Sequence, residues 1–75
     1  AYFKLGRYDE AQRYLRESVV GDPHSSLSWE HLGDVCEQLG QKDGAKTAWT
    51  KALSLTSDTN TSRRLKGKLD LTIRP

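Results

Sequence analysis

The sequence predicts an all-α fold in which antiparallel helix-turn-helix repeats stack as a short solenoid. Two observations carry this prediction. Apolar and small residues recur at helical spacing in successive stretches. In addition, a shift of 34 residues superposes Leu5-Gly6-x-x-Asp9-x-Ala11 on Leu39-Gly40-x-x-Asp43-x-Ala45. A repeated helix pair is the simplest cause of such a period.

Composition limits the classes of protein to which the chain can belong. Of the 75 residues, 29% are charged and 35% hydrophobic, which suits a thin helical layer better than a compact core. No run approaches the ~18 apolar residues of a membrane span. Cys36 is the only cysteine, so an internal disulfide is impossible and a cysteine-based zinc site is not expected. A single thiol also slightly favours the cytoplasm over an oxidising compartment.

The first 25 residues are expected to form a truncated repeat unit. Residues 1–5 match the end of a helix, and Gly6 is placed to stop it in the left-handed conformation that glycine tolerates. A second helix is predicted from about Tyr8 to Val20, and Pro23 ends it. Its inward face consists of the residues that share helical spacing: Tyr8, Ala11, Leu15, Ser18 and Val19.

Residues 26–57 are expected to form a complete unit. Ser25 or Ser26 is a plausible N-cap for a helix from Leu27 to Leu39, which Gly40 closes. Its apolar stripe is Trp29, Leu32, Val35, Cys36 and Leu39. A further helix is predicted from about Asp43 to Leu55, with Ala45, Ala48, Trp49, Ala52 and Leu53 facing inward.

Residues 58–75 are expected to form a capping helix with a frayed basic tail. The helix is predicted from about Thr61 to Leu69, and its apolar contacts are restricted to Leu65, Leu69 and Leu71. One weak apolar face beside a charged one is typical of the end of a repeat array. The last residues, Thr72 to Pro75, are expected to fray.

The complete unit resembles a tetratricopeptide repeat, whose 34-residue signature is W-x-x-L-G-x-x-Y, then A-x-x-x-F, then P. The matching residues are Trp29, Leu32, Gly33, Ala45, Trp49 and Ala52, together with Gly6, Ala11 and Pro23 of the preceding unit. Cys36 replaces the aromatic residue and Ser57 the closing proline. The resemblance implies the C-terminal part of a longer array, with about one and a half repeats and a cap in a right-handed solenoid.

The same resemblance implies a non-catalytic scaffold that binds a peptide or helix segment of a protein partner in a concave groove. The residues expected to line this groove are Leu27, Glu30, His31, Asp34, Glu37 and Gln38, with Phe3 and Lys4 from the truncated helix. The acidic residues favour a basic or amide-rich ligand. An alternative interpretation is that Arg64 neutralises Glu30 and Lys68 neutralises Asp34, because each pair is related by the repeat.

Other functions have less support in the sequence. No catalytic residues, cofactor or metal are predicted, and the five-residue spacing of His31 and Cys36 does not aim both at one metal ion. The basic run Arg63-Arg64-x-Lys66-x-Lys68 makes weak contact with nucleic acid or another anionic surface the alternative function. Nucleic acid is the less favoured partner because no aromatic residue follows Leu53 to stack on bases.

One further partner is suggested by the start of the chain. Tyr2, Phe3 and Leu5 form an apolar edge that is expected to drive self-association when it is exposed.

Overall fold

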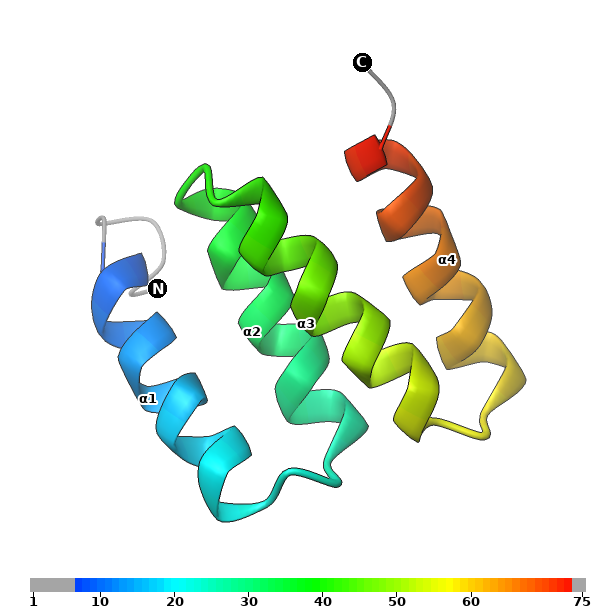
Figure 1. The fold of residues 1–75 in the computed structure, drawn as a ribbon, viewed down its shortest axis with the longest axis horizontal. Helices are drawn as coiled ribbons and strands as arrows, with labels where there is room; N and C mark the ends of the chain where they lie inside the picture. Colours follow the sequence, from blue (N-terminus) through cyan, green and yellow to red (C-terminus); the bar gives the residue numbers. More distant parts are fainter. Residues whose placement is uncertain (1–6, 74–75) are drawn as a thin grey trace.

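The computed structural model describes residues 7–73, and within this range the chain forms four helices and no strand (Figure 1). They are α1 (Tyr8–Gly21), α2 (Ser26–Gln38), α3 (Lys42–Leu55) and α4 (Thr59–Ile73). The predicted all-α helical repeat is confirmed. Gly6, the predicted stop of the truncated helix, and the apolar edge at Tyr2, Phe3 and Leu5 lie outside the described residues.

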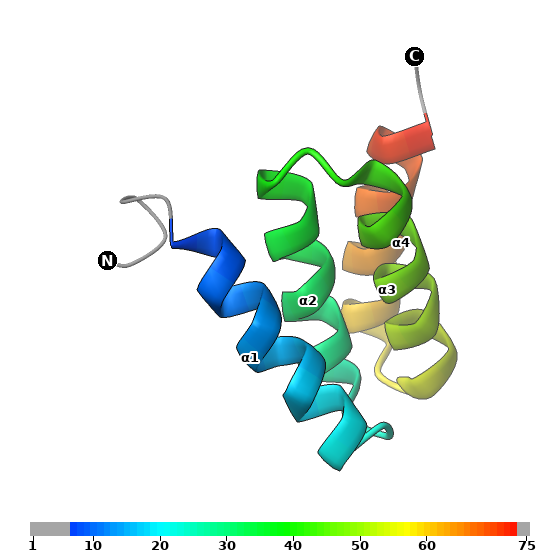
Figure 2. The same cartoon turned by 60° about the vertical axis from the view of Figure 1, so that its left-hand side comes forward.

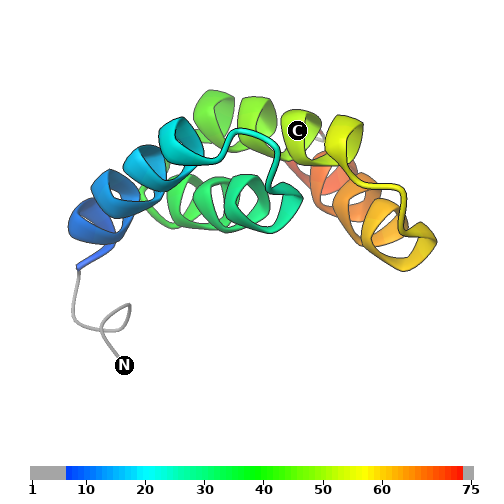
Figure 3. The same cartoon turned by 90° about the horizontal axis from the view of Figure 1, so that it is seen from below.

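Successive helices run antiparallel and form two layers. Seen from below, α1 and α3 lie in one layer and α2 and α4 in the other, so that the whole describes an arch (Figure 3). Helices α2 and α3 lie side by side, whereas the start of α1 diverges from the end of α2 (Figure 2). The packing between the second and third helices is therefore closer than the packing between the first and second.

The boundaries of α2 follow from local chemistry. The hydroxyl oxygen of Ser25 accepts a hydrogen bond from the backbone N–H of Ser28 at 3.3 Å, so Ser25 is the N-cap. Gly40 has a φ of +76° and ends the hairpin turn after α2, as predicted. At the start of α4, the Asp58 carboxylate accepts hydrogen bonds from the backbone N–H of Thr61 at 2.8 Å and its hydroxyl at 2.7 Å.

The core is centred on the contact between α2 and α3. Trp49 is 1% exposed, and its ring lies against Gly33, where a Cβ atom would come within 2.4 Å of the indole. Gly33 therefore permits this tryptophan to pack directly against the α2 backbone. The remaining buried apolar residues are Val19, Leu32, Val35, Cys36, Ala45, Ala48, Ala52 and Leu65.

Two expectations about the packing are corrected. Helix α4 continues to Ile73 rather than ending at Leu69, because no proline lies between Thr59 and Ile73 and Gly67 does not interrupt the helix. Thr72 and Ile73, which were expected to fray, are therefore helical. The apolar stripe predicts that Trp29 fills the space between the helices, but it is only partly buried. Its indole N–H donates to the Pro23 carbonyl at 2.9 Å, so the ring lies at the edge of the core beside the preceding loop.

Candidate functional site

An open groove of about 640 Å³ lies between α1 and α2. The α1 side is formed by Tyr8, Ala11, Tyr14 and Leu15, and the other side by His31, Asp34, Val35, Glu37, Gln38 and Lys68. Aliphatic side chains of Ala11, Leu15 and Val35 supply its apolar part, and acidic, amide and imidazole groups border it. We call this feature the α1–α2 groove.

The predicted ligand residues of α2 separate into three groups. His31, Asp34, Glu37 and Gln38 all line the α1–α2 groove. Leu27 is 58% exposed but does not line it. Glu30 is buried, at 3% exposure. Phe3 and Lys4, the remaining predicted ligand residues, lie outside the described residues.

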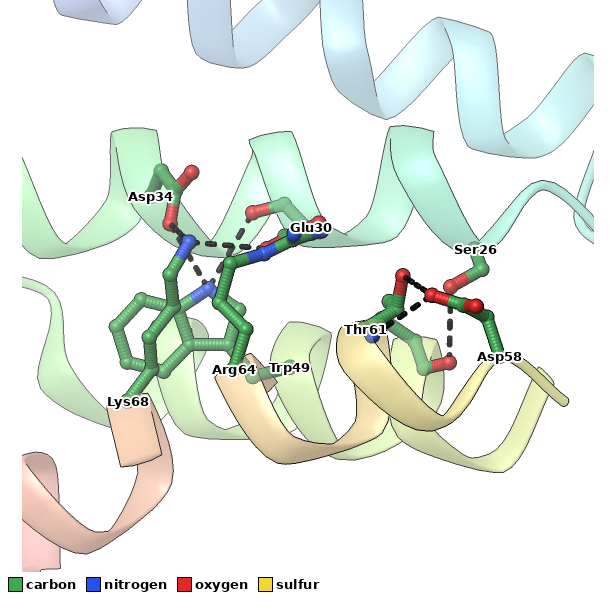
Figure 4. Close-up of polar contacts among 9 residues, drawn as sticks. Ser26, Glu30, Asp34, Trp49, Asp58, Thr61, Arg64 and Lys68 are labelled. Carbon is green, nitrogen blue, oxygen red and sulfur yellow. Dashed lines mark hydrogen bonds and ion pairs between the residues drawn. The ribbon is translucent and has the colours of Figure 1, made fainter. Parts of the chain in front are cut away.

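Glu30 belongs to an ion-pair cluster that joins α2 to α4 (Figure 4). One carboxylate oxygen, Oε2, accepts a hydrogen bond from Arg64 Nε at 2.6 Å. The other, Oε1, accepts one from Arg64 Nη2 at 2.8 Å. Lys68 Nζ lies 3.1 Å from Glu30 and 2.7 Å from Asp34. The pairs predicted from the repeat spacing are therefore formed, and Glu30 does not present a free carboxylate to a ligand, contrary to the simple acidic-groove expectation.

The cluster changes the acid–base properties of its members. The hydrogen bonds from Arg64 outweigh the raising effect of burial, and with the contribution of Lys68 they lower the pKa of Glu30 from 4.5 to about 2. Burial by itself would lower the pKa of Lys68, but its hydrogen bonds to Asp34 and Glu30 outweigh this effect and raise it. Both groups are consequently charged at neutral pH.

Trp49 connects this cluster to α3. Its indole N–H lies 3.3 Å from the Glu30 carbonyl and 3.1 Å from Asp34 Oδ1 (Figure 4). Lys68 Nζ lies 5.8 Å from the centre of the indole ring, within the range of a cation–π interaction. Trp49 thus links three helices. The charged side chains around it bind one another and stabilise the fold.

Gln12 is a buried polar residue that the sequence reasoning missed. It is 8% exposed, and its side-chain amide donates to Gln41 Oε1 at 2.6 Å and to Cys36 Sγ at 3.3 Å. A signal was present, because Gln12 lies three residues before Leu15 and therefore on the inward face of α1. The amide holds the start of α1 to the turn after α2.

Two kinds of site were not found in the part of the chain that the structure describes. Between residues 7 and 73 there is no cluster of three or more His, Cys, Asp or Glu that could hold a metal ion. In the same range, no helix combines the length and the apolar character that a membrane crossing requires.

Comparison with protein families supports the repeat directly. The family model described as tetratricopeptide repeat matches residues 1–19 and 27–59. A search of curated proteins gives no match to the chain.

Proposed function

The chain belongs to the tetratricopeptide repeat family, and on that premise we propose that it binds a peptide or helix segment of a partner protein along the α1–α2 groove. Tetratricopeptide repeats generally mediate protein–protein interaction and are generally non-catalytic scaffolds. The observation that supports this site is the convergence of four predicted ligand residues, His31, Asp34, Glu37 and Gln38, on one open groove.

The ion pairs refine the chemistry expected of the ligand. Arg64 and Lys68 neutralise Glu30 and part of the charge of Asp34. The Asp34 side chain remains 43% exposed and Glu37 is exposed, so some acidic character persists at the border of the groove. A suitable ligand is an amphipathic segment, with apolar side chains for Ala11 and Leu15 and one basic or amide group for these carboxylates.

The alternative function, weak contact with nucleic acid or another anionic surface, has less support. Two cations of the basic run, Arg64 and Lys68, are bonded to carboxylates of α2. A phosphate would have to compete with these bonds, which reduces the counterion release that drives such binding. This function stays a prediction of lower weight.

A test of the groove does not require the natural partner. A random peptide library displayed on phage supplies the probe, and the affinity of each selected peptide is measured for three chains. The groove variant carries His31→Ala with Glu37→Ala, and the control carries Lys46→Ala with Thr50→Ala on the outward surface of α3. We expect the groove variant to bind roughly ten-fold more weakly, which is ~1.4 kcal/mol, and the control to be unchanged.

The same affinity measurements can contradict the proposed site. If both variants bind them as tightly as the wild-type chain, the peptides recognise another surface and the proposed site is wrong.

A further inference from the structure

The α1–α2 groove contains a cation that comes from α4. Of the described residues of α4, Lys68 alone lines the groove, and its side chain is 28% exposed. Its ammonium group donates hydrogen bonds to Asp34 Oδ1 at 2.7 Å and to Glu30 Oε2 at 3.1 Å. A ligand that enters the groove at Asp34 therefore meets an ion pair rather than a separate carboxylate.

One oxygen of this ion pair is accessible to a ligand. Asp34 Oδ1 accepts hydrogen bonds from both Lys68 Nζ and the Trp49 indole N–H. Among the described residues, no group donates to Asp34 Oδ2, and Figure 4 shows one oxygen of this carboxylate directed away from Lys68. The Asp34 side chain is 43% exposed. It can thus accept a further hydrogen bond from a ligand in the groove.

The charge of Lys68 limits which ligand group can donate that bond. A basic group at Asp34 would lie against the same carboxylate as the Lys68 ammonium, and like charges at such short range repel strongly. An acidic group would be repelled by Asp34 and Glu30. A carboxamide carries no net charge, so its NH2 group can donate to Asp34 while its carbonyl dipole is favourable beside the ammonium. The ion pair therefore favours asparagine or glutamine.

Glu37 presents the opposite case. It lines the same groove and is exposed, and no cation in the described part of the chain pairs with its carboxylate. A basic ligand group at Glu37 is attracted without meeting a resident cation. Asp34 and Glu37 are three residues apart on α2, where Cβ atoms are ~5–6 Å apart. Side chains three or four residues apart on a helical ligand have the same separation.

We propose that the ligand of the α1–α2 groove is a helical segment with a carboxamide side chain for Asp34 and Lys68 and, three or four residues away, a basic side chain for Glu37. Lys68 determines the specificity, because it excludes a basic group from the Asp34 position. This inference rests on the proposed function, since it names the ligand chemistry of the same groove.

Peptides selected from the displayed random library on the wild-type chain supply the probe. Alanine replaces each peptide position in turn, and a double-mutant cycle with Asp34→Ala identifies the position that faces Asp34. Peptides with glutamine or lysine at this position are then measured on the wild-type chain and on a Lys68→Met chain. The control chain carries Lys66→Met, because Lys66 is exposed on α4 and does not line the groove.

We expect the wild-type and Lys66→Met chains to bind the glutamine peptide roughly ten-fold more tightly than the lysine peptide. The Lys68→Met chain should lose this preference, because no cation then opposes the lysine. A lysine peptide that binds the wild-type chain as tightly as the glutamine peptide would overturn the proposal. A preference that persists in Lys68→Met, or peptides with no position coupled to Asp34, would also overturn it.

The basic subsite has its own measurement. Methionine in place of the basic residue of the peptide should weaken binding to the wild-type chain roughly five-fold and leave binding to a Glu37→Gln chain unchanged. Equal weakening on both chains would show that Glu37 does not receive the basic group, and the proposed ligand would be wrong.

Failure of the proposed function gives a different result. If the His31→Ala, Glu37→Ala groove variant binds the selected peptides as tightly as the wild-type chain, the peptides occupy another surface, and this inference falls with the site. The comparison of the glutamine and lysine peptides on the wild-type chain requires no variant, so it decides the proposal even if Lys68→Met does not fold.

Discussion

The packing of α2 against α3 and the open groove between α1 and α2 use equivalent repeat positions, yet in the described part of the chain only the first is closed. On the closed side, Trp49 is 1% exposed and lies against Gly33. On the open side its equivalent, Leu15, borders a groove of about 640 Å³. A repeat position is therefore part of the core only where a neighbouring helix covers it.

Ion pairs between α2 and α4 also stabilise the closed side, which is formed by α2, α3 and α4. Among the described side chains of α4, only Leu65 is fully buried, so apolar contact alone holds this helix weakly. Arg64 and Lys68 add bonds to the buried Glu30. Helix α4 therefore depends on this polar cluster as well as on the apolar contact of Leu65.

The largest expected effect is that of Trp49→Ala. Removing a buried tryptophan costs ~3–5 kcal/mol, which is about the whole net stability of a domain of this size. We expect the variant to lose its helical circular dichroism signal at room temperature. The matched change Leu15→Ala, on the open side, should cost only about 1–2 kcal/mol because this residue is partly buried. Equal effects in urea titrations would contradict the comparison.

The second effect concerns the charge cluster and depends on pH. The pKa of Glu30 is lowered from 4.5 to about 2 in the folded chain, so its ionised form contributes stability above pH 4.5 that is lost as the pH falls toward 2. We expect Glu30→Gln to cost about 3 kcal/mol at pH 7. Urea titrations should show the difference from wild type shrinking between pH 5 and pH 2. A difference independent of pH would show that the carboxylate charge contributes little.

The third effect compares two glycines related by the repeat. A Cβ atom at Gly33 would lie 2.4 Å from the Trp49 ring, whereas one at Gly67 would meet nothing within 4 Å. Gly33→Ala should therefore destabilise by about 1–3 kcal/mol through overpacking. Gly67→Ala should stabilise α4 by about 0.5–1 kcal/mol, because alanine is the better helix former. Thermal unfolding of both variants checks the opposite signs, and a shared sign would contradict this account.

The smallest effect lies at the helix starts. Ser25 caps α2 through its hydroxyl, whereas the residue before α1, Arg7, provides no side-chain cap. Ser25→Ala should cost about 1 kcal/mol in a urea titration, and Ser25→Asp should restore most of this loss because aspartate is an equally good N-cap. Failure of aspartate to restore stability would show that the hydroxyl serves another contact.

Much of this arrangement could be predicted from the sequence because the repeat fixes both spacing and neighbours. The period places Gly40 at a turn and pairs Arg64 with Glu30, as the structure does. It also predicts an inward position for Ala45, Ala48, Trp49 and Ala52, and all four are buried. These predictions depend on the backbone path, which a 34-residue repeat determines closely.

The features that were missed or wrongly predicted depend on side chains at the margins of the repeat. Gln12 is buried because Gln41 and Cys36 accept its hydrogen bonds, and a hydrophobic pattern does not count such a residue. Trp29 occupies a signature position, but it lies in the first turn of α2, where the neighbouring loop leaves it partly exposed. The helical face of Glu30 predicts a place in the groove, although α4 covers this residue.

Amide hydrogen exchange of the wild-type chain measures the difference between the two sides most directly, because it reports the free energy of local opening helix by helix. Because α2 and α3 form the closely packed pair, we expect the amides that exchange most slowly to lie in these two helices. We also expect the amides of α1 to exchange faster than those of α3 at equivalent repeat positions. Exchange in α1 as slow as that in α3 would contradict the central claim that only one of these two equivalent sites is fully packed.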